Sequence, residues 1–455
     1  MRCIERSPDV RIRTAQWRSH RALAFMFCAL SSAGGMASFV GCASDTNGTE
    51  STEGTADGAT NHVEASDGPE SPDAADASSD VADSGGFADA GSPLTVKCTK
   101  SPCPVSLSAA RGTYCALLDT GRVACWGDNS SYQLGQGADS GIQGSDVPLE
   151  VPGVEGAVAV RGTCAVLGDG VVKCWGQGNF LQANGPRPPA TTNVAPSPVT
   201  LPIPPAMGIS VTSDVLDNLG GCAALVSGEL LCWGYFVWYS VASGPKFLDA
   251  GGTPYADYSP TISILSDGHA AVDVMVGPTS FARDERGVIW SWGAQSSLGR
   301  VSSMNLDPYP MPISIDGVTS FDASAANACA VARGQVYCWG GYDTILFATP
   351  TLIPFDVAVV SVATAPTLVS KVNPHGFACA ITAKHDLYCW GDNSNGMIGN
   401  GTRTTLELVP VKVDLPGPVA TVRPTSNQVC AVLENGELYC WGLGRKTTPE
   451  RVVFQ

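Results

Sequence analysis

Short apolar runs alternate with polar turns along most of the chain, and one pair of such runs returns seven times. The first pair covers residues 114–117 and 123–126, around the turn Asp119-Thr120-Gly121. Two apolar runs joined by a three-residue turn that ends in glycine predict a β-hairpin. The starts of the seven copies lie 48 to 59 residues apart. This period is typical of repeat architectures, in which each unit buries its apolar face against its neighbours.

Every full copy has a cysteine, nine further residues, a second cysteine and then Trp-Gly. The full copies occupy 115–127, 164–176, 222–234, 379–391 and 430–442. A shortened copy at 329–340 has eight residues between its cysteines. In the copy at 281–293, Phe281 and Ser291 replace both cysteines together.

The two cysteines of a copy are expected to face each other across the hairpin. Counting outward from the turn places Cys115 opposite Cys125, and a two-residue Arg333-Gly334 turn keeps the same register in the shortened copy. Facing positions on antiparallel strands are close enough for a disulfide, and their joint loss in one copy indicates that they work as a pair. The alternative is a set of small buried thiols. The predicted disulfide cysteines are Cys115, Cys125, Cys164, Cys174, Cys222, Cys232, Cys329, Cys338, Cys379, Cys389, Cys430 and Cys440.

The tryptophan after each second strand is expected to be structural. An indole fills the space between neighbouring sheets, and the glycine that follows lets the chain leave the strand sharply. The seven repeat tryptophans are Trp126, Trp175, Trp233, Trp292, Trp339, Trp390 and Trp441.

Two copies continue after Trp-Gly into Asp-Asn-Ser loops, at 126–135 and 390–399. Together with the hairpin, these loops resemble the regulator of chromosome condensation repeat family. The resemblance implies an all-β fold, a seven-bladed β-propeller over residues 96–455, and members that mostly act by protein contact. The paired cysteines depart from the eukaryotic members and are similar to those of a secreted bacterial variant.

Strand-like segments at 105–107 and 448–454 lie at the two ends of the repeat region. We expect them to meet in one shared blade, because a closed ring has no exposed sheet edges. The Pro- and Asn-rich segment 177–204 is predicted to be a surface loop.

Residues 1–42 have the composition of an export signal, with a basic start, an apolar core at 22–30 and small residues after it. The segment ends in Ser-Phe-Val-Gly-Cys, which resembles a bacterial lipobox and implies lipidation of Cys42. Ordinary signal cleavage and an uncleaved helix are the alternatives. Lipidation predicts a lipoprotein of the outer membrane or cell surface, and ordinary cleavage predicts a periplasmic or secreted protein.

Residues 43–95 are predicted to be a disordered linker. They contain twelve acidic residues and no lysine or arginine, and few apolar residues. Residues 96–455 carry 20 basic and 28 acidic residues, and this balance argues against nucleic acid as a partner because nucleic acid needs a basic surface.

Cysteine usage indicates an oxidising compartment. Fourteen cysteines follow the signal segment, an even number, and twelve of them belong to the hairpins. Cys98 and Cys103 form the remaining pair, and we expect a disulfide there because a zinc site would need more ligands than this stretch supplies.

The sequence contains no catalytic, phosphate-binding or calcium-binding motif, and its five histidines are scattered. We therefore predict a non-enzymatic, monomeric, protein-binding scaffold with no cofactor or metal, which contacts a membrane only through its lipid. An aromatic run at Tyr235, Phe236, Trp238 and Tyr239 suggests two alternatives, a contact patch or an ordinary outer strand. A contact patch would support a second function, carbohydrate binding or polysaccharide degradation.

Overall fold

The computed structural model describes residues 91–110, 112–177, 194–211, 221–233, 261–263, 265, 268–294, 297–304, 306–324, 327–340, 347–365 and 376–454. All of them lie in the second of two compact units, 80–455. Within these residues, no helix is long and apolar enough to cross a membrane.

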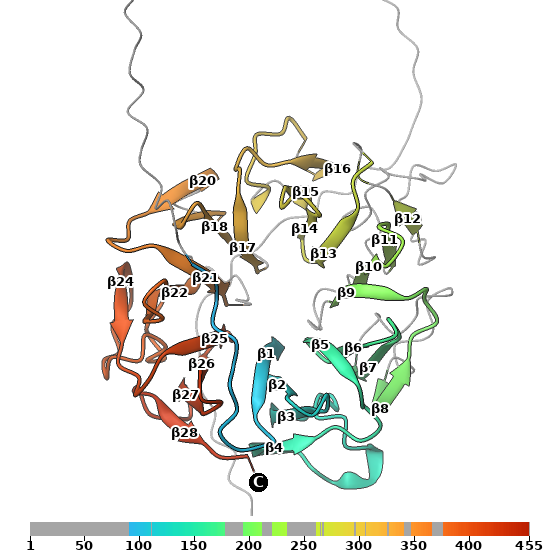
Figure 1. Cartoon of the computed structure of the whole chain (residues 1–455), viewed down its shortest axis with the longest axis vertical. Helices are drawn as coiled ribbons and strands as arrows, with labels where there is room; N and C mark the ends of the chain where they lie inside the picture. The colour runs from blue at the N-terminus through green and yellow to red at the C-terminus, as the bar shows by residue number, and fades with distance from the viewer. Residues whose placement is uncertain are drawn as a thin grey trace, which may run out of the picture. The chain divides into compact units, whose positions relative to one another are not determined.

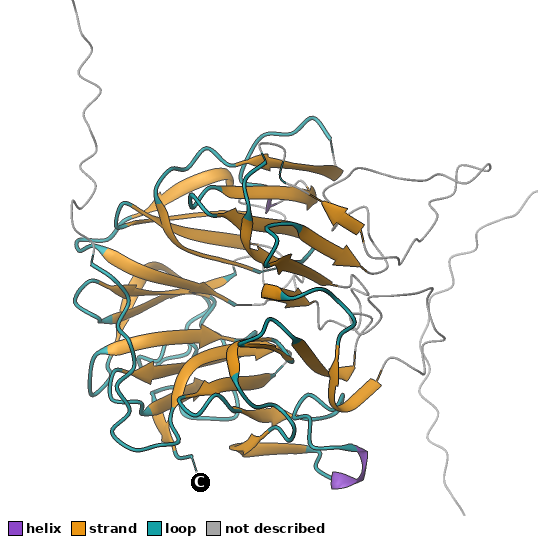
Figure 2. Ribbon diagram, turned by 45° about the vertical axis from the view of Figure 1, so that its right-hand side comes forward, coloured by secondary structure: helices purple, strands orange, loops and turns teal. Residues whose placement is uncertain are grey.

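Seven four-stranded antiparallel sheets follow one another along the chain as the blades of a propeller (Figure 1). Figure 2 shows strands throughout the described part, together with the short 3-10 helix η1 (Ala138–Ser140). Blades 1 to 3 contain β1 (Pro104–Ala110), β2 (Thr113–Leu118), β3 (Val123–Asp128), β4 (Gly144–Glu150), β5 (Ala157–Arg161), β6 (Cys164–Leu167), β7 (Val172–Gln177), β8 (Val194–Thr200), β9 (Ala206–Val211), β10 (Gly221–Leu225), β11 (Leu230–Trp233) and β12 (Thr261–Ser263). Blades 4 and 5 contain β13 (Ala271–Met275), β14 (Thr279–Asp284), β15 (Ile289–Ala294), β16 (Leu306–Pro312), β17 (Val318–Ala323), β18 (Asn327–Ala332), β19 (Gln335–Gly340) and β20 (Phe347–Ile353). Blades 6 and 7 contain β21 (Val359–Thr364), β22 (Phe377–Thr382), β23 (Leu387–Gly391), β24 (Glu407–Val413), β25 (Val419–Pro424), β26 (Gln428–Leu433), β27 (Leu438–Gly442) and β28 (Glu450–Val452).

The predicted hairpins are the second and third strands of the blades, in the predicted register. Cys115 pairs with Cys125, and Cys329 pairs with Cys338 across the shortened turn. That turn places both Arg333 and Gly334 at positive φ, 51° and 75°. In the sixth hairpin His385 takes the left-handed position, at φ 62°, that glycine takes in most of the others.

Each apolar cluster of the described residues joins two neighbouring blades. The cysteines of one blade and the repeat tryptophan of the next belong to the same cluster, as with Cys115, Cys125 and Trp175. The seam between blades 4 and 5 lacks a disulfide, and there Phe281 lies against Trp339 with 6.3 Å between ring centroids. The seven repeat tryptophans are at most 8 % exposed, so their predicted structural role is confirmed.

Several indoles also donate a hydrogen bond to the preceding blade. Nε1 of Trp441 donates to the Met397 carbonyl at 2.7 Å, and Trp175 and Trp339 make the same contact in their own seams. Gly399 lies so close to the Trp441 ring that a Cβ there would be 2.7 Å from Nε1. In each of these three seams, the residue two positions after the accepting carbonyl is a glycine, and its lack of a side chain lets the tryptophan ring pack closely against the preceding blade.

The segment 177–204 is not a loop throughout. Its residues Val194–Thr200 form β8, which pairs with β7 as the outer strand of blade 2. The sequence did not indicate this strand because it contains two prolines and no aromatic residue. An edge position tolerates proline because its outward amides need no partner in the sheet.

The two ends of the repeat region do not share a blade, so that prediction was wrong. β1 pairs with β2 inside blade 1, and β28 pairs with β27 inside blade 7. The ring is closed by an apolar seam in which Trp126 of blade 1 meets Phe454, at 6.2 Å between ring centroids. Pairing within a blade closes a much shorter stretch of chain than pairing across the whole repeat region, and so costs less entropy.

Candidate functional site

The innermost strands of the blades surround a central channel, with a cavity of about 730 Å³. These strands are β1, β5, β9, β13, β17, β21 and β25 (Figure 1). A cavity of this size could admit a ligand or a partner's loop, and we take it as the candidate site.

One position of each innermost strand forms a layer that we call the channel belt. It is the residue paired with the first cysteine of the hairpin, or with Phe281 in blade 4. The belt residues are Ser108, Arg161, Ser210, Met275, Asp322, Ala363 and Arg423. The belt therefore combines charged, hydroxyl and apolar side chains at equivalent positions.

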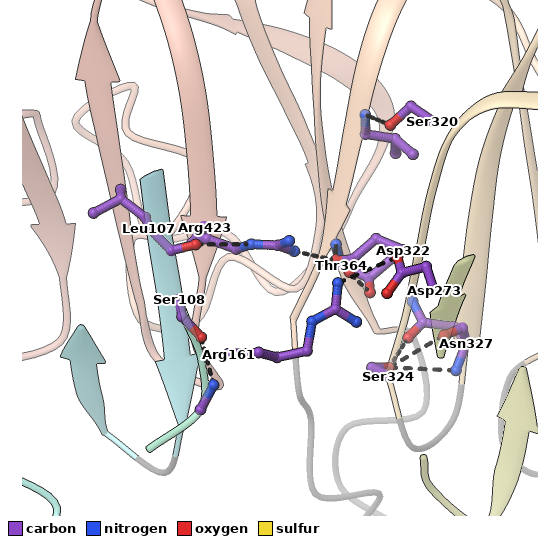
Figure 3. Close-up of polar contacts among 12 residues, drawn as sticks. Leu107, Ser108, Arg161, Asp273, Ser320, Asp322, Ser324, Asn327, Thr364 and Arg423 are labelled. Atoms are coloured by element: carbon purple, nitrogen blue, oxygen red, sulfur yellow. Dashed lines mark hydrogen bonds and ion pairs between the residues drawn. The ribbon is translucent and has the colours of Figure 1, made fainter. Parts of the chain in front are cut away.

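Arg423 connects blade 7 to blades 5 and 1 (Figure 3). Its Nη1 lies 2.8 Å from Oδ2 of Asp322, and its Nε donates to the Leu107 carbonyl at 3.4 Å. The same carboxylate oxygen accepts the backbone N–H of Thr364 at 2.7 Å and its hydroxyl at 3.2 Å. One carboxylate oxygen thus holds strands from three blades.

Arg161 spans from blade 2 to blade 4 in a similar way. Its Nη1 donates to the Val274 carbonyl at 3.2 Å, and its Nη2 lies 3.5 Å from Oδ2 of Asp273. Both side chains of this pair are about 30 % exposed. Solvent screens such a pair, so it contributes more to the arrangement of the channel wall than to stability.

Serine hydroxyls fasten neighbouring strands at the channel wall. Ser108 Oγ accepts the Gly162 amide at 2.6 Å, and Ser210 Oγ accepts the Val276 amide at 3.0 Å. Ser320 does the same for Val362 at 3.2 Å (Figure 3). Each bond gives a partner to a backbone amide at the inner edge of a sheet, where there is no further strand to pair with.

The described lining of the channel combines polar and apolar side chains. Among the residues that the structure describes, it contains three arginines, three aspartates and several hydroxyls, and no histidine, cysteine or aromatic residue. Arg283 forms no ion pair with any residue that the structure describes, whereas Arg161 and Arg423 are paired. Its charged and hydroxyl groups can form ion pairs and hydrogen bonds with a polar partner.

Blade 4 has an ion pair where the other blades have a disulfide. Arg300 donates from Nε to Ser291 Oγ at 3.1 Å and from Nη1 to Asp307 Oδ2 at 2.7 Å. Both charged side chains are at most 13 % exposed. Burial raises the pKa of the Asp307 carboxyl, but hydrogen bonds from Arg300 and Ser302 outweigh it, so the pKa lies below its ordinary value of 3.8.

Asp307→Asn should lower the free energy of unfolding at neutral pH by about 2 kcal/mol, the usual size of a hydrogen bond to a charged group. A carboxyl with a lowered folded-state pKa contributes stability above its unfolded pKa and loses it as the pH falls through the folded pKa. The gap between wild type and variant should therefore be full above about pH 4 and shrink below it. Urea unfolding from pH 2 to 8 measures this gap, with the exposed Asp316→Asn as control. A gap that does not change with pH would contradict the role of the ion pair.

The structure joins all fourteen predicted cysteines as seven disulfides, including Cys98–Cys103. Asp119 lies close to the sulfurs of that pair, but sulfurs bonded to each other cannot serve as thiolate ligands for a metal. Cys42 and the aromatic run Tyr235, Phe236, Trp238 and Tyr239 lie outside the described residues, so their predicted roles stay predictions.

The belt residues escaped sequence reasoning, which found the hairpins but not the strand before each of them. A usable signal exists, because Arg161, Asp322 and Arg423 are charged residues in otherwise apolar or small-residue strands just ahead of a hairpin copy. The fourth copy also keeps the loop element Ser297-Leu298-Gly299, equivalent to Met397-Ile398-Gly399, although its Asp-Asn-Ser residues are absent.

Comparison with known proteins gives a consistent result at the level of the repeat. The regulator of chromosome condensation (RCC1) repeat matches residues 105–133 and 375–396. Among curated proteins, the ultraviolet-B receptor UVR8 of Arabidopsis thaliana is 28 % identical over 234 residues, which is 48 % of this chain and 50 % of that protein. The mouse regulator of chromosome condensation is 26 % identical over 163 residues, 35 % of this chain and 38 % of that protein. The chain thus matches half or less of the length of these relatives.

Solved structures show the same fold. The structure of Prp20p from Saccharomyces cerevisiae, described with its binding to Gsp1p and histones, has a TM-score of 0.57 at 19 % identity and covers 80 % of this chain and 87 % of that one. Human WBSCR16 has a TM-score of 0.56 at 15 % identity, over 73 % of this chain and 94 % of that one.

Proposed function

Because the chain belongs to the regulator of chromosome condensation repeat family, we propose that it is a non-enzymatic scaffold that binds another protein at its central channel. The observation that carries this proposal is the described lining of the channel, which offers charged and hydroxyl side chains from several blades that a protein partner could contact. The described binding of Prp20p to Gsp1p and histones is in keeping with a protein partner. The partner expected here is a polypeptide with polar, charged side chains, because such groups can match the Arg and Asp residues of the wall.

Carbohydrate binding is the second candidate, and its support is the aromatic run at 235–239 in the sequence. Sugar rings are commonly held against aromatic side chains through their apolar faces. The described residues of the channel lining include no aromatic side chain, so the run at 235–239 alone supports this candidate.

Arg283→Glu should abolish retention of the partner without changing the melting temperature, because Arg283 lines the channel but forms no ion pair with any residue that the structure describes. The assay is a pull-down from envelope extracts, with the exposed, off-channel Arg403→Glu as the matched control. Equal retention by both variants would exclude the channel as the site. Retention of polysaccharide rather than protein would favour the second candidate.

We further propose that the scaffold is exported and held at a bacterial cell envelope by a lipid on Cys42, with 43–95 as the tether. Seven disulfides are typical of a protein that matures in an oxidising compartment. A single acyl chain gives weak attachment, so diacylation of Cys42 is what would hold the protein at the membrane.

Intact-mass analysis of the protein produced with its own leader tests the anchor. We expect a mature chain that begins at Cys42 and carries acyl groups, with fourteen cysteines alkylated only after reduction. An unprocessed chain with free thiols would refute export, and a processed chain without acyl groups would refute the anchor alone.

A further inference from the structure

The segment before β1 lies outside the blades and contacts blade 7. Lys97 donates its amide to the Glu434 carbonyl at 2.6 Å, and Thr99 donates its amide to the Asn435 carbonyl at 3.2 Å. The Lys97 ammonium also lies 2.8 Å from Oε1 of Glu434. These acceptors belong to the turn between β26 and β27, so the start of the described chain is bound to the last blade.

The Cys98–Cys103 loop, which we call the clasp, connects this turn to blade 1. The Cys103 amide donates to Oδ1 of Asp119 at 3.0 Å, and the Asp119 amide donates to the Cys103 carbonyl at 3.0 Å. On its other side the clasp fits against Gly436, where a Cβ would lie 2.6 Å from the Cys103 sulfur. One disulfide loop therefore touches the hairpin turns of both blades that meet at the closing seam.

The clasp is also an accessible disulfide. Eleven of the twelve hairpin cysteines are buried, and Cys338 is half-buried. In the clasp, Cys103 is buried but Cys98 is half-buried and lies on an irregular segment rather than inside a sheet. A thiolate must approach one sulfur of a disulfide along the S–S axis, and an irregular surface loop allows this approach more readily than a strand pair covered by the next blade.

We propose that Cys98–Cys103 is a thiol–disulfide exchange site whose reduction by a dithiol loosens the ring between blades 1 and 7. One thiolate of the dithiol attacks the Cys98 sulfur, the S–S bond breaks, and Cys103 leaves as a thiolate that takes up a proton. The second thiolate of the dithiol then displaces Cys98, which takes up the second proton. Two electrons pass to the protein, and the dithiol becomes a disulfide.

Loss of this bond frees the backbone of the clasp from its closed shape. The amides of Lys97 and Thr99 then face the blade-7 turn on a flexible chain, and their hydrogen bonds open more often. The seam keeps its apolar cluster and the Arg423–Leu107 bond, so the blades stay folded. Reduction therefore changes only the contact between blades 1 and 7, whose innermost strands β1 and β25 line the channel.

Graded reduction of the full chain with dithiothreitol, followed by alkylation and peptide mass analysis, tests the order of reduction. We expect Cys98 and Cys103 to be alkylated at a dithiothreitol concentration at least about tenfold below that needed for any hairpin pair. At that concentration, amide exchange in the peptide holding Lys97 and Thr99 should accelerate roughly tenfold or more, while peptides from β10 and β22 stay protected. Earlier alkylation of Cys329 and Cys338, or unchanged exchange at Lys97 and Thr99 after clasp reduction, would overturn the proposal.

The double variant Cys98→Ser/Cys103→Ser reproduces the reduced clasp without reductant. It should show the same faster exchange at Lys97 and Thr99, whereas Cys329→Ser/Cys338→Ser, which removes the other half-accessible pair, should leave these two amides protected. Equal exchange in the two variants would overturn the proposal. Should the clasp variant fail to fold, the partial reduction of the wild-type chain decides alone.

Discussion

Deleting residues 443–455 should lower the free energy of unfolding by about 4–6 kcal/mol, as the burial of a valine, part of a phenylalanine and several backbone hydrogen bonds is lost. The deletion removes β28, whose Val452 is 8 % exposed, and Phe454, which covers Trp126 of blade 1. It also removes the Thr447 carbonyl that accepts the Gly401 amide of blade 6 at 3.0 Å. The last segment therefore supports blade 7 on both of its sides.

Thermal and urea unfolding of the deletion variant and the full chain measure this loss. Val453→Ala is the control, since Val453 is 61 % exposed and its truncation should change stability by no more than about 0.5 kcal/mol. An unchanged unfolding midpoint in the deletion variant would show that the ring does not depend on β28 for its closure.

Trp441→Ala should cost about 3–5 kcal/mol, the usual range for removing a large buried aromatic side chain. Trp441 is fully buried in the seam between blades 6 and 7, beside the Cys379–Cys389 disulfide. Its removal leaves a cavity that Gly399 cannot fill, and the Met397 carbonyl loses its donor. Neighbouring strands are held by their own sheets, so they cannot collapse into the space.

Trp441→Phe separates the two parts of this effect. It keeps an aromatic ring in the seam but removes the N–H, so it should cost about 1–3 kcal/mol for the carbonyl left unpaired. Equal losses in the alanine and phenylalanine variants would mean that the hydrogen bond, rather than the filled volume, holds the seam. Urea unfolding at one pH measures the free energy of unfolding of the wild type and of the two variants.

The hairpins could be read from sequence because their contacts are local. Cys115 and Cys125 are separated by ten positions, and a turn of known length fixes which residues face each other. The joint replacement of both cysteines by Phe281 and Ser291 also indicated that the two positions face each other, and these two residues do pair between β14 and β15. The resemblance to the repeat family then implied one blade for each of the seven copies.

The channel could not be read in this way. Arg161 and Asp273 are 112 positions apart, and the contact exists only because a ring brings blade 2 near blade 4. The buried Arg300–Asp307 pair is closer in sequence, but nothing in its residues distinguishes it from a solvated pair before its burial is known. The prediction that the two terminal strands share one blade was wrong for a related reason. Each of these strands has two possible partners, and the sequence does not indicate which of them it pairs with.

Each disulfide in the part of the chain that the structure describes closes a loop inside one blade or in the segment just before the first, and none of these seven links one blade to another. Pulled by its two ends, the domain would therefore come apart at the seam between blades 1 and 7 and then unravel blade by blade. A closed hairpin withholds about nine residues from the stretched chain, roughly 30 Å of contour length. Blade 4, with Phe281 and Ser291 in place of the cysteines, would release that length in full, so its extension step would be the longer one and would mark its position in a force trace.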